Sequence, residues 1–276
     1  MNALEIRGLT KRRGDFALQG LDLTLPAGCI MGLIGENGAG KSTTIRLILN
    51  ALSRDGGTVA VYGKDNRALT PLEREDIGAV LDEVGLPEYM TARQIGRMMA
   101  GIFTRWQPEV YRGYLRRLAL PEDKPFRDFS RGMKMKLGLA VALSHQPKLL
   151  LLDEATSGLD PVVRDEILTI FADFTRDEEH AVLISSHIVS DLEKICDYIA
   201  FLHRGRLLLC EEKDRLTEEY GILRGDTDGI APAAVCGRHT TPYGTEYLVR
   251  RDAVPVGMAL GQVNIEDLFV FMAKEA

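Results

Sequence analysis

The sequence has few features of membrane-spanning, secreted or nucleic-acid-binding proteins. None of its apolar runs approaches the ~18 residues that a membrane-spanning helix needs. Lysine and arginine number 34 against 40 for aspartate and glutamate, so the net charge is −6. This balance offers no basic surface for nucleic acid, and we expect no nucleic-acid partner. The N-terminal stretch MNALEIRGLTKRRGD contains no apolar segment of the kind found in signal peptides.

Cysteine is also scarce. The four cysteines occur at positions 29, 196, 210 and 236 and form no CxxC pair, which excludes a dense disulfide framework. Such cysteine usage is typical of a reducing compartment. Together with the missing leader and the missing membrane-spanning runs, it leads us to expect a cytoplasmic protein.

Strand patterns and helix patterns alternate along most of the chain. Hydrophobic residues make up 45% of the 276 residues, which is enough to bury a full core. We expect strands at 3–7, 17–25, 29–35, 57–63, 147–155 and 180–187, a hairpin at 199–211, and helices at 41–52, 160–174 and 188–198. This alternation predicts an α/β fold with a mainly parallel core sheet.

Two segments depart from that alternation. From about residue 87 to residue 146, helical patterns rich in methionine, arginine and leucine predict a helical subdomain inserted between two strands. After residue 215, short strand patterns and a final amphipathic helix indicate a small α/β module. We therefore divide the chain into a main domain, residues 1–215, and a C-terminal accessory module, residues 216–276.

A glycine-rich loop lies between a predicted strand and a predicted helix. The stretch GENGAGKS, residues 35–42, matches the phosphate-loop pattern GxxxxGK[ST] in the context that the motif requires. Its glycines let backbone N–H groups surround phosphate oxygens, Lys41 would reach the β- and γ-phosphates, and the Ser42 hydroxyl would ligate Mg²⁺. The predicted nucleotide-binding residues are Gly35, Glu36, Asn37, Gly38, Ala39, Gly40, Lys41, Ser42 and Thr43. The motif predicts a nucleoside-triphosphate site.

Two acids follow the apolar strand LLLL at 149–152. The carboxyl ends of buried parallel strands meet at the edge of the sheet where ligands of α/β proteins collect. Asp153 would hold Mg²⁺, directly or through water, and Glu154 is the candidate general base for water that attacks the γ-phosphate. His187 ends the next predicted strand and could donate to the γ-phosphate and hold the base in register.

The stretch DFSRGMKMK, residues 128–136, is unusual for the start of a helix. Ser130 is a good N-cap, but Arg131, Lys134 and Lys136 follow it where acids are favoured, and Gly132 stands where a helix former would be better. This composition suits a helix end that receives an anion on its exposed backbone N–H groups.

The phosphate loop, SRGM, LLLLDEATSGLD and SSH occur in this order, and the set resembles the ATP-binding subunits of ABC transporters over residues 3–215. The resemblance implies ATP and Mg²⁺ as ligands and a head-to-tail dimer with two ATP molecules between the subunits. The signature residues Ser130, Arg131, Gly132 and Met133 would then meet the ATP of the partner subunit. The segment Ser157, Gly158, Leu159 and Asp160 would connect the two sites.

The sequence departs from the family pattern at three places. Arg131 stands where the signature usually has glycine. The loop that usually contains glutamine and links the ATPase to its membrane subunit has Asp82 or Glu83 at that place. The aromatic residue that usually stacks on adenine is replaced by Arg13, whose guanidinium can stack on a purine, while Phe16 is close enough to substitute.

Within the family, the sequence is similar to small bacterial exporter ATPases encoded beside GntR-type repressors, a group that includes the exporter of phenol-soluble modulin peptides. The implied partner is a separately encoded membrane transporter, on which the chain would sit at the inner face of the membrane. A soluble ABC ATPase that acts on ribosomes or DNA is the alternative. A P-loop kinase or GTPase is a third reading, in which SRGM and SGLD would have no role and for which the guanine-reading NKxD is absent.

Overall fold

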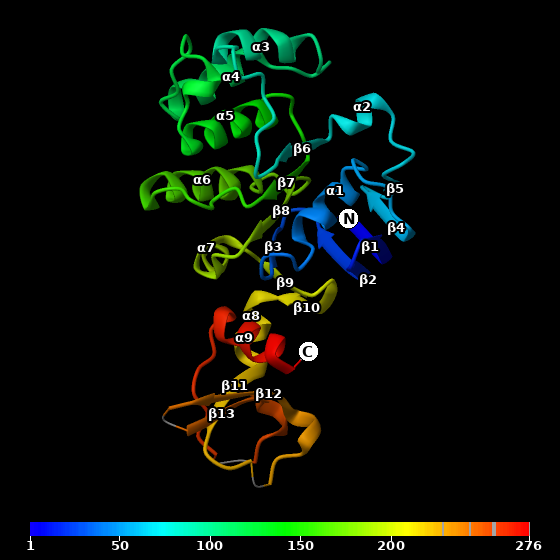
Figure 1. The fold of residues 1–276 in the computed structure, drawn as a ribbon, viewed down its shortest axis with the longest axis vertical. Coiled ribbons are helices and arrows are strands. Elements are labelled where there is room, and N and C mark those ends of the chain that lie inside the picture. Colours follow the sequence, from blue (N-terminus) through cyan, green and yellow to red (C-terminus); the bar gives the residue numbers. More distant parts are fainter. Residues whose placement is uncertain (228, 243, 256–257, 276) are drawn as a thin grey trace.

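The computed structural model describes residues 1–227, 229–242, 244–255 and 258–275. A six-stranded sheet forms the centre of the main domain (Figure 1). In spatial order its strands are β10 (Arg206–Glu212), β9 (Tyr198–His203), β3 (Ile30–Ile34), β8 (Ala181–Ser186), β7 (Leu149–Asp153) and β6 (Ile77–Val80). All neighbouring pairs are parallel except β9 and β10, which form a hairpin at the edge. The predicted mainly parallel core sheet is thus confirmed.

The central strands are buried because their sequences are apolar on both faces. Every residue of β3, β7 and β8 is buried, as expected for strands of a parallel sheet that is covered on both sides. Their carboxyl ends therefore carry the first polar side chains. This sequence pattern places the phosphate loop and the acids after LLLL at one edge of the sheet.

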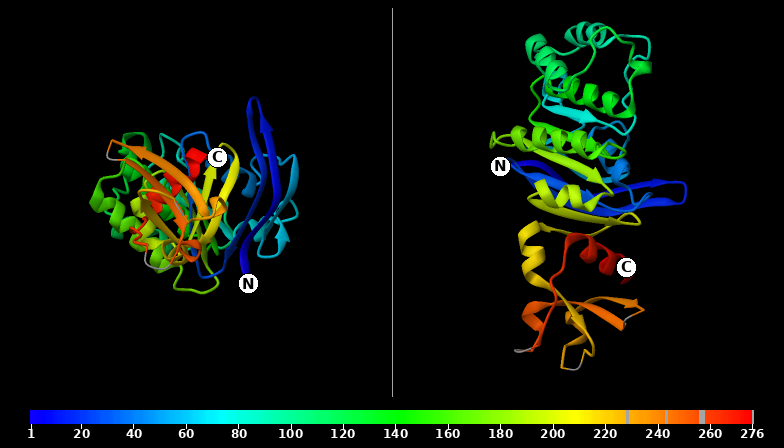
Figure 2. Two further views of the ribbon diagram at one scale, coloured as in Figure 1. Left: turned by 90° about the horizontal axis from the view of Figure 1, so that it is seen from below. Right: turned by 90° about the vertical axis from the view of Figure 1, so that its left-hand side faces the viewer.

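A second, antiparallel sheet packs beside the first. Its strands, in spatial order, are β2 (Phe16–Pro26), β1 (Asn2–Arg13), β4 (Gly56–Val61) and β5 (Lys64–Asp65). Helix α1 (Lys41–Ile48) contributes Ile45, Leu47 and Ile48 to the core that the two sheets share. The view from below in Figure 2 shows the long β1 and β2 ribbon standing to one side of the six-stranded sheet. The strands expected at 3–7 and 17–25 are both present and extend further than the sequence pattern indicated.

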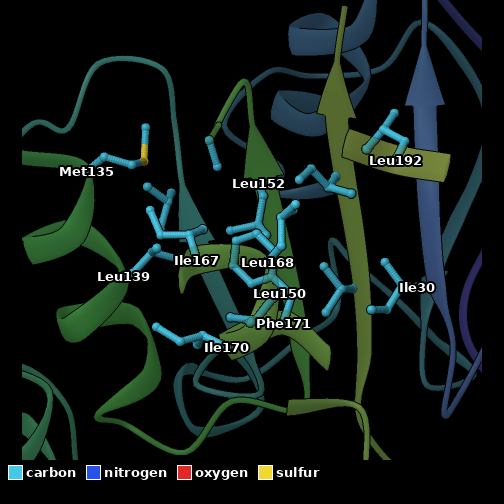
Figure 3. Packing of buried hydrophobic residues seen from close by; sticks show 14 of the residues in the cluster. Ile30, Met135, Leu139, Leu150, Leu152, Ile167, Leu168, Ile170, Phe171 and Leu192 are labelled. Carbon is cyan, nitrogen blue, oxygen red and sulfur yellow. The ribbon is translucent and has the colours of Figure 1, made fainter. Parts of the chain in front are cut away.

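Helices cover the opposite face of the central sheet. They are α6 (Pro161–Phe174) and α7 (Val189–Ile195), with α5 (Arg131–Leu143) lying beyond α6. Figure 3 shows side chains of α6, such as Leu168 and Phe171, meeting Leu150 and Leu152 of β7, with Leu139 of α5 on their other side. One apolar cluster therefore connects the sheet to the helical segment.

The helical segment lies between β6 and β7 in the chain and forms one end of the molecule in Figure 1. It consists of α3 (Ala92–Ala100), α4 (Pro108–Arg117), the short 3-10 helix η1 (Phe126–Asp128) and α5, and a small helix α2 (Pro71–Arg74) precedes it beyond β6. Thr91 caps α3 by accepting a hydrogen bond from the backbone of Gln94. The helical subdomain expected from the sequence is present.

The C-terminal residues form a separate small sheet with helices on one side, seen at the other end of the molecule in Figure 2. Its elements are α8 (Lys213–Glu219), β11 (Tyr220–Arg224), η2 (Pro232–Ala234), β12 (Val235–Thr241), β13 (Gly244–Arg250), η3 (Arg251–Ala253) and α9 (Ile265–Glu275). Helix α9 joins this sheet to the main domain, since the Phe269 and Phe201 rings lie 5.3 Å apart and the Ile265 N–H donates to Glu193.

Strands β5 and β6 and helices α2 and α8 lie where the sequence analysis placed no regular element. Strand β6 has only four residues, IGAV, too few to show a period. In the described ranges, no helix has both the length and the apolar character to cross a membrane.

Candidate nucleotide-binding site

The phosphate loop runs from the end of β3 into α1 and is built on close backbone approaches. A Cβ on Gly35 would lie 2.4 Å from the carbonyl oxygen of Leu202 in β9, so only glycine fits there. Gly40, the residue before α1, has a φ of 114° and lies against the ring of Phe16, where a Cβ would come within 2.8 Å. No side chain caps α1, and no acid occupies its first turn. The first N–H groups of this helix are therefore available to an anion.

Lys41 points back over the loop instead of outward to solvent. Its ammonium group donates to the carbonyl oxygens of Gly35 at 2.7 Å and Glu36 at 3.3 Å. The same nitrogen lies 3.2 Å from Oε1 of Glu154, and the lysine side chain is 6% exposed. The positive charge of Lys41 is thus held at the end of β7, beside Glu154.

Asp153 is buried, and its carboxylate is held by the neighbouring strand. The Ser185 hydroxyl, from β8, donates to Oδ1 of Asp153 at 2.7 Å. The acid lies behind the wall of the nucleotide pocket, whereas Ser42 contributes to that wall. Any contact of Asp153 with a nucleotide-bound cation would have to be made from this second layer, which favours a bridging water.

Glu154 occupies a strained backbone position with both side-chain oxygens engaged. Its φ is 53°, in the left-handed region, and its N–H donates to the carbonyl oxygen and hydroxyl of Ser185, both at 3.1 Å. Nδ1 of His187 lies 2.7 Å from Oε2, while Lys41 contacts the other carboxylate oxygen. The three side chains proposed for catalysis from the sequence thus form one contiguous chain.

A pocket of about 390 Å³ lies over the phosphate loop. Its lining residues are Arg13, Phe16, Glu36, Asn37, Gly38, Gly40, Lys41, Ser42, Thr43, Asp82 and Glu154. The two remaining residues of the predicted set, Gly35 and Ala39, lie beneath this lining. Both candidates for the adenine platform are at the pocket, because Arg13 and Phe16 are directly opposite each other in the β1–β2 pairing.

The signature residues begin α5 and lie outside this pocket. Ser130 is the N-cap, and its hydroxyl oxygen accepts a hydrogen bond from the Met133 N–H at 3.3 Å. A Cβ on Gly132 would meet only Leu159, at an ordinary 3.4 Å. A larger side chain would therefore fit at position 132 without a clash inside the chain. Ser130 is exposed and accessible to a ligand from outside the chain.

The segment SGLD connects β7 to α6 beside the start of α5. Gly158 has a φ of 70°, and Leu159 is buried against the signature helix. Asp160 caps α6, as the sequence predicted, by accepting a hydrogen bond from the Val163 N–H at 3.1 Å. The Ser157 N–H donates to the carbonyl oxygen of Glu154, so this loop is directly tied to the candidate base.

The two acids of the candidate coupling loop have different surroundings. Asp82 lines the nucleotide pocket and accepts a hydrogen bond from Arg131 at 2.9 Å. Glu83 faces a second groove, which Asp82 shares. The sequence treated the two acids as equivalent, because nothing in a loop sequence shows which side chain turns inward.

Sequence reasoning did not select two other groups at the site. Ser185 holds both Asp153 and Glu154, and its position in LISSH at the end of a buried strand was a signal that could have found it. His203, at the end of β9, is buried with Nδ1 3.2 Å from Oε1 of Glu36 in the phosphate loop. Only the sheet order, which places β9 beside β3, reveals that contact.

Among the residues that the structure describes, no group of three or more histidine, cysteine or acidic side chains could hold a metal ion by itself. Mg²⁺ in nucleotide sites needs only one or two protein oxygens, because phosphates and water supply the rest of its shell. Ser42 in the pocket wall and the carboxylates of Asp82 and Asp153 near it fit that limited role.

Comparison with known proteins is decisive for the family. The family model described as "ABC transporter" matches residues 18–157, from β2 through the phosphate loop and the helical segment to the SGLD loop. The chain belongs to the ABC transporter ATP-binding proteins. Members of this family hydrolyse ATP, and this ATP-binding subunit is an ATPase that powers a membrane transporter.

The relatives of this ATP-binding subunit include transport ATPases of several bacteria. The bacitracin transport ATP-binding protein BcrA of Enterococcus faecalis is 31% identical over 275 residues, covering 95% of this chain and 87% of the relative. The Nod factor export ATP-binding protein I of a Rhizobium species is 35% identical over 225 residues, covering 79% and 73%. A solved ATP-binding subunit of an ABC transporter superimposes with a TM-score of 0.70 at 26% identity, covering 78% of this chain and 92% of that one.

Proposed function

We propose that this subunit hydrolyses ATP at composite sites in a head-to-tail dimer and thereby powers a separately encoded membrane exporter. The observation that carries the proposal is the chain Lys41–Glu154–His187, of which Lys41 and Glu154 line the nucleotide pocket. It supplies a phosphate-binding cation, a carboxylate base and a group that orients the base. The SGLD loop and the signature helix lie directly beside it.

The chemistry follows from what surrounds Glu154. While Lys41 contacts Oε1, the carboxylate is neutralised; a γ-phosphate that takes the lysine's hydrogen bonds would leave this oxygen free to accept a proton. Water then attacks the γ-phosphorus, its proton passes to Glu154, and the bond to the β–γ bridging oxygen breaks, giving ADP and phosphate. His187 keeps the second oxygen in place during the transfer.

Mg²⁺ enters this scheme as the ion that accompanies ATP. When bound, it neutralises charge on the β- and γ-phosphates, and the Ser42 hydroxyl and Asp153 would hold it. Ser185 positions Asp153 for this task by donating to one oxygen and leaving the other to face the ion or its water. Adenine would stack on Phe16, whose ring rests on Gly40, or on the more exposed Arg13.

The dimer is supported by exposed groups near the start of α5 and α6. None of the signature residues lines the pocket described above, although Ser130 is exposed and α5 carries no acid in its first turn. Val162, in the first turn of α6 beside the SGLD loop, is 78% exposed. A second subunit placed head to tail would cover this valine and bring its phosphates to the first subunit's Ser130 and Gly132.

The membrane partner would dock on the groove beside the coupling loop. This groove of about 610 Å³ is lined by the carboxylates of Asp82, Glu83 and Glu88, by the cations of Arg131 and Lys134, and by the rings of Phe126 and Phe129, so that its acids outnumber its cations. Acidic and apolar groups together suit an amphipathic helix with a basic face, and lysine and arginine are in excess on the cytoplasmic side of membrane proteins. The subunit would therefore be cytoplasmic, bound to the inner face of the membrane through its partner.

Export is supported by the relatives named above, one of which is described as an export protein. An amphipathic or antimicrobial-type peptide is our proposed cargo class. We further propose residues 1–215 as the ATPase domain, with the helical insertion at about 87–146, and residues 216–276 as an accessory module.

Coexpression with the neighbouring genes tests the proposal. The subunit should copurify with an integral membrane protein, whose presence should raise ATP turnover. Glu83→Lys should reduce this stimulation and the reconstituted transport together, while Glu109→Lys, an exposed acid on α4, should leave both unchanged. A subunit that copurifies with ribosomes or DNA, or stays alone when the whole operon is expressed, would contradict a role in export.

A further inference from the structure

Two positions that depart from the family pattern are in direct contact. Arg131 replaces the first glycine of the signature, and Asp82 stands in the loop that usually contains glutamine. In the folded chain Nη2 of Arg131 donates to Oδ1 of Asp82 at 2.9 Å, although 49 residues separate them. A basic residue and an acidic residue at these two places thus form one interaction.

Asp82 belongs to the wall of the nucleotide pocket. It follows β6 by two residues, as Glu154 follows Leu152 of β7, and Val80 and Leu152 are partners in the parallel pairing. The two carboxylates therefore leave the sheet at the same level, and both line the pocket with Lys41 and Ser42. An uncompensated Asp82 would repel a triphosphate, whereas a cation bound to that triphosphate would attract it.

Arg131 touches both segments that surround the start of α5. A Cβ on Gly158 would lie 3.1 Å from its Nη1, so the guanidinium rests on the SGLD loop while it pairs with Asp82. The pair consequently ties the pocket wall, the signature helix and the SGLD loop together. Both side chains are more than half exposed, so the interaction is weak and screened by salt, which makes it easy to break.

We propose that the Asp82–Arg131 pair is a latch of the nucleotide-free subunit, which opens when Asp82 turns to the magnesium ion of bound ATP. The opened latch releases Arg131 at the exposed end of α5, where its charge adds to the N–H groups that would meet the partner's phosphate. This inference rests on the proposed nucleotide site. Arg131 and Asp82 are positioning residues in this scheme, and the bond-making groups remain Glu154 and water.

The test is equilibrium binding of a non-hydrolysable ATP analogue, measured with Mg²⁺ and with EDTA at protein concentrations where sedimentation shows a monomer. The readout is the ratio of the two dissociation constants, EDTA over Mg²⁺. In Arg131→Gln, Asp82 is free for the ion and repels the bare triphosphate, so the ratio should rise about 1.5- to 5-fold. In Asp82→Asn the carboxylate that attracts the ion and repels the bare triphosphate is gone, and the ratio should fall below the wild-type value.

Controls separate the latch from local damage and from the site itself. Arg131→Lys keeps the charge pair and should restore a ratio near that of the wild type. Glu83→Gln and Arg127→Gln remove neighbouring charges outside the pocket and should leave the ratio unchanged. Lys41→Ala should abolish binding in either buffer; undiminished binding by this variant would refute the proposed nucleotide site.

If Lys41→Ala loses binding but Arg131→Gln and Asp82→Asn keep the wild-type ratio or shift it in the same direction, the latch is refuted and the site stands. Opposite shifts, with rescue by Arg131→Lys, would establish it.

Discussion

The two acids Glu154 and Asp82 lie at the ends of neighbouring strands, yet their surroundings differ. Glu154 is 14% exposed, and its side chain is held by Lys41 and His187 while its N–H is held by Ser185. Asp82 is 54% exposed and has one exposed partner, Arg131. The base of a hydrolysis reaction must be held in one geometry. A group that responds to nucleotide binding, as we propose for Asp82, needs a partner that it can leave at a small cost in free energy.

The same contrast in exposure and support separates a catalytic half of the site, made of the phosphate loop and the ends of β7 and β8, from the rest of the site. The phosphate loop and the polar residues at the ends of β7 and β8 are held by contacts between neighbouring strands of the buried sheet. The pairing of these strands therefore fixes their geometry. The signature helix, the coupling loop and the adenine platform present more exposed groups, for which we propose partners outside the chain or in the nucleotide. We therefore expect the catalytic half to tolerate substitution least.

The largest effect should come from Glu154→Gln. The amide keeps the size of the side chain but cannot accept the proton of water, and losing a general base costs ~10²–10⁴-fold in turnover. Steady-state ATPase measurements should show this loss, while ATP affinity is retained and a dimer accumulates with ATP in size-exclusion chromatography. Turnover like that of the wild type would remove Glu154 from the role of base.

Gly132→Asp should nearly abolish turnover through the partner subunit. Within the chain an added Cβ meets only Leu159 at 3.4 Å, so the fold and the binding of ATP to the monomer should survive. In the dimer the new carboxylate would face phosphate and repel it. Mixing this variant with Lys41→Ala should restore at most one working site per mixed dimer. Specific activity that stays constant on dilution of the wild type below dimer formation would contradict the composite site.

Ser185→Ala probes the support of the catalytic half. It removes the hydroxyl that donates to buried Asp153, while the Glu154 N–H keeps its bond to the Ser185 carbonyl, and leaving the Asp153 oxygen unpaired costs ~1–3 kcal/mol of unfolding free energy. Urea denaturation should show this loss, and the Mg²⁺ concentration needed for half-maximal turnover should rise. Ser144→Ala, which deletes a buried hydroxyl bound to the Ala140 carbonyl, should lower stability without changing the Mg²⁺ requirement. Equal Mg²⁺ requirements in both variants would contradict a role of Ser185 in positioning Asp153.

The smallest effect should come from the adenine platform. Stacking on a ring or a guanidinium is worth ~0.5–2 kcal/mol, so alanine at the true platform should weaken binding from a few-fold to about thirtyfold. Titration of ATP and ADP against Arg13→Ala and Phe16→Ala should show the same loss for both nucleotides, because adenine is common to them. If neither variant changes affinity, the base lies elsewhere in the pocket.

The sequence by itself determined the family, the mainly parallel sheet and the residues of the phosphate loop. Apolar runs such as LLLL and the glycines of GENGAGKS have few alternative uses, because burial on both faces and close backbone approach restrict which residues can occur. The cap formed by Asp160 and the hairpin at Arg204 could be predicted for the same reason: each depends on residues that are close in the chain.

Only the tertiary structure decided which distant groups meet. It showed that Ser185 supports the two acids, that His203 lies against Glu36 of the phosphate loop, and that Asp82 lines both the nucleotide pocket and the groove whereas Glu83 lines only the groove. It also paired Asp82 with Arg131 across 49 residues. Such contacts depend on the order of strands in the sheet and on the docking of α5. Both arise from the packing of apolar surfaces, and that packing is compatible with many different pairs of polar side chains at the edge of the sheet.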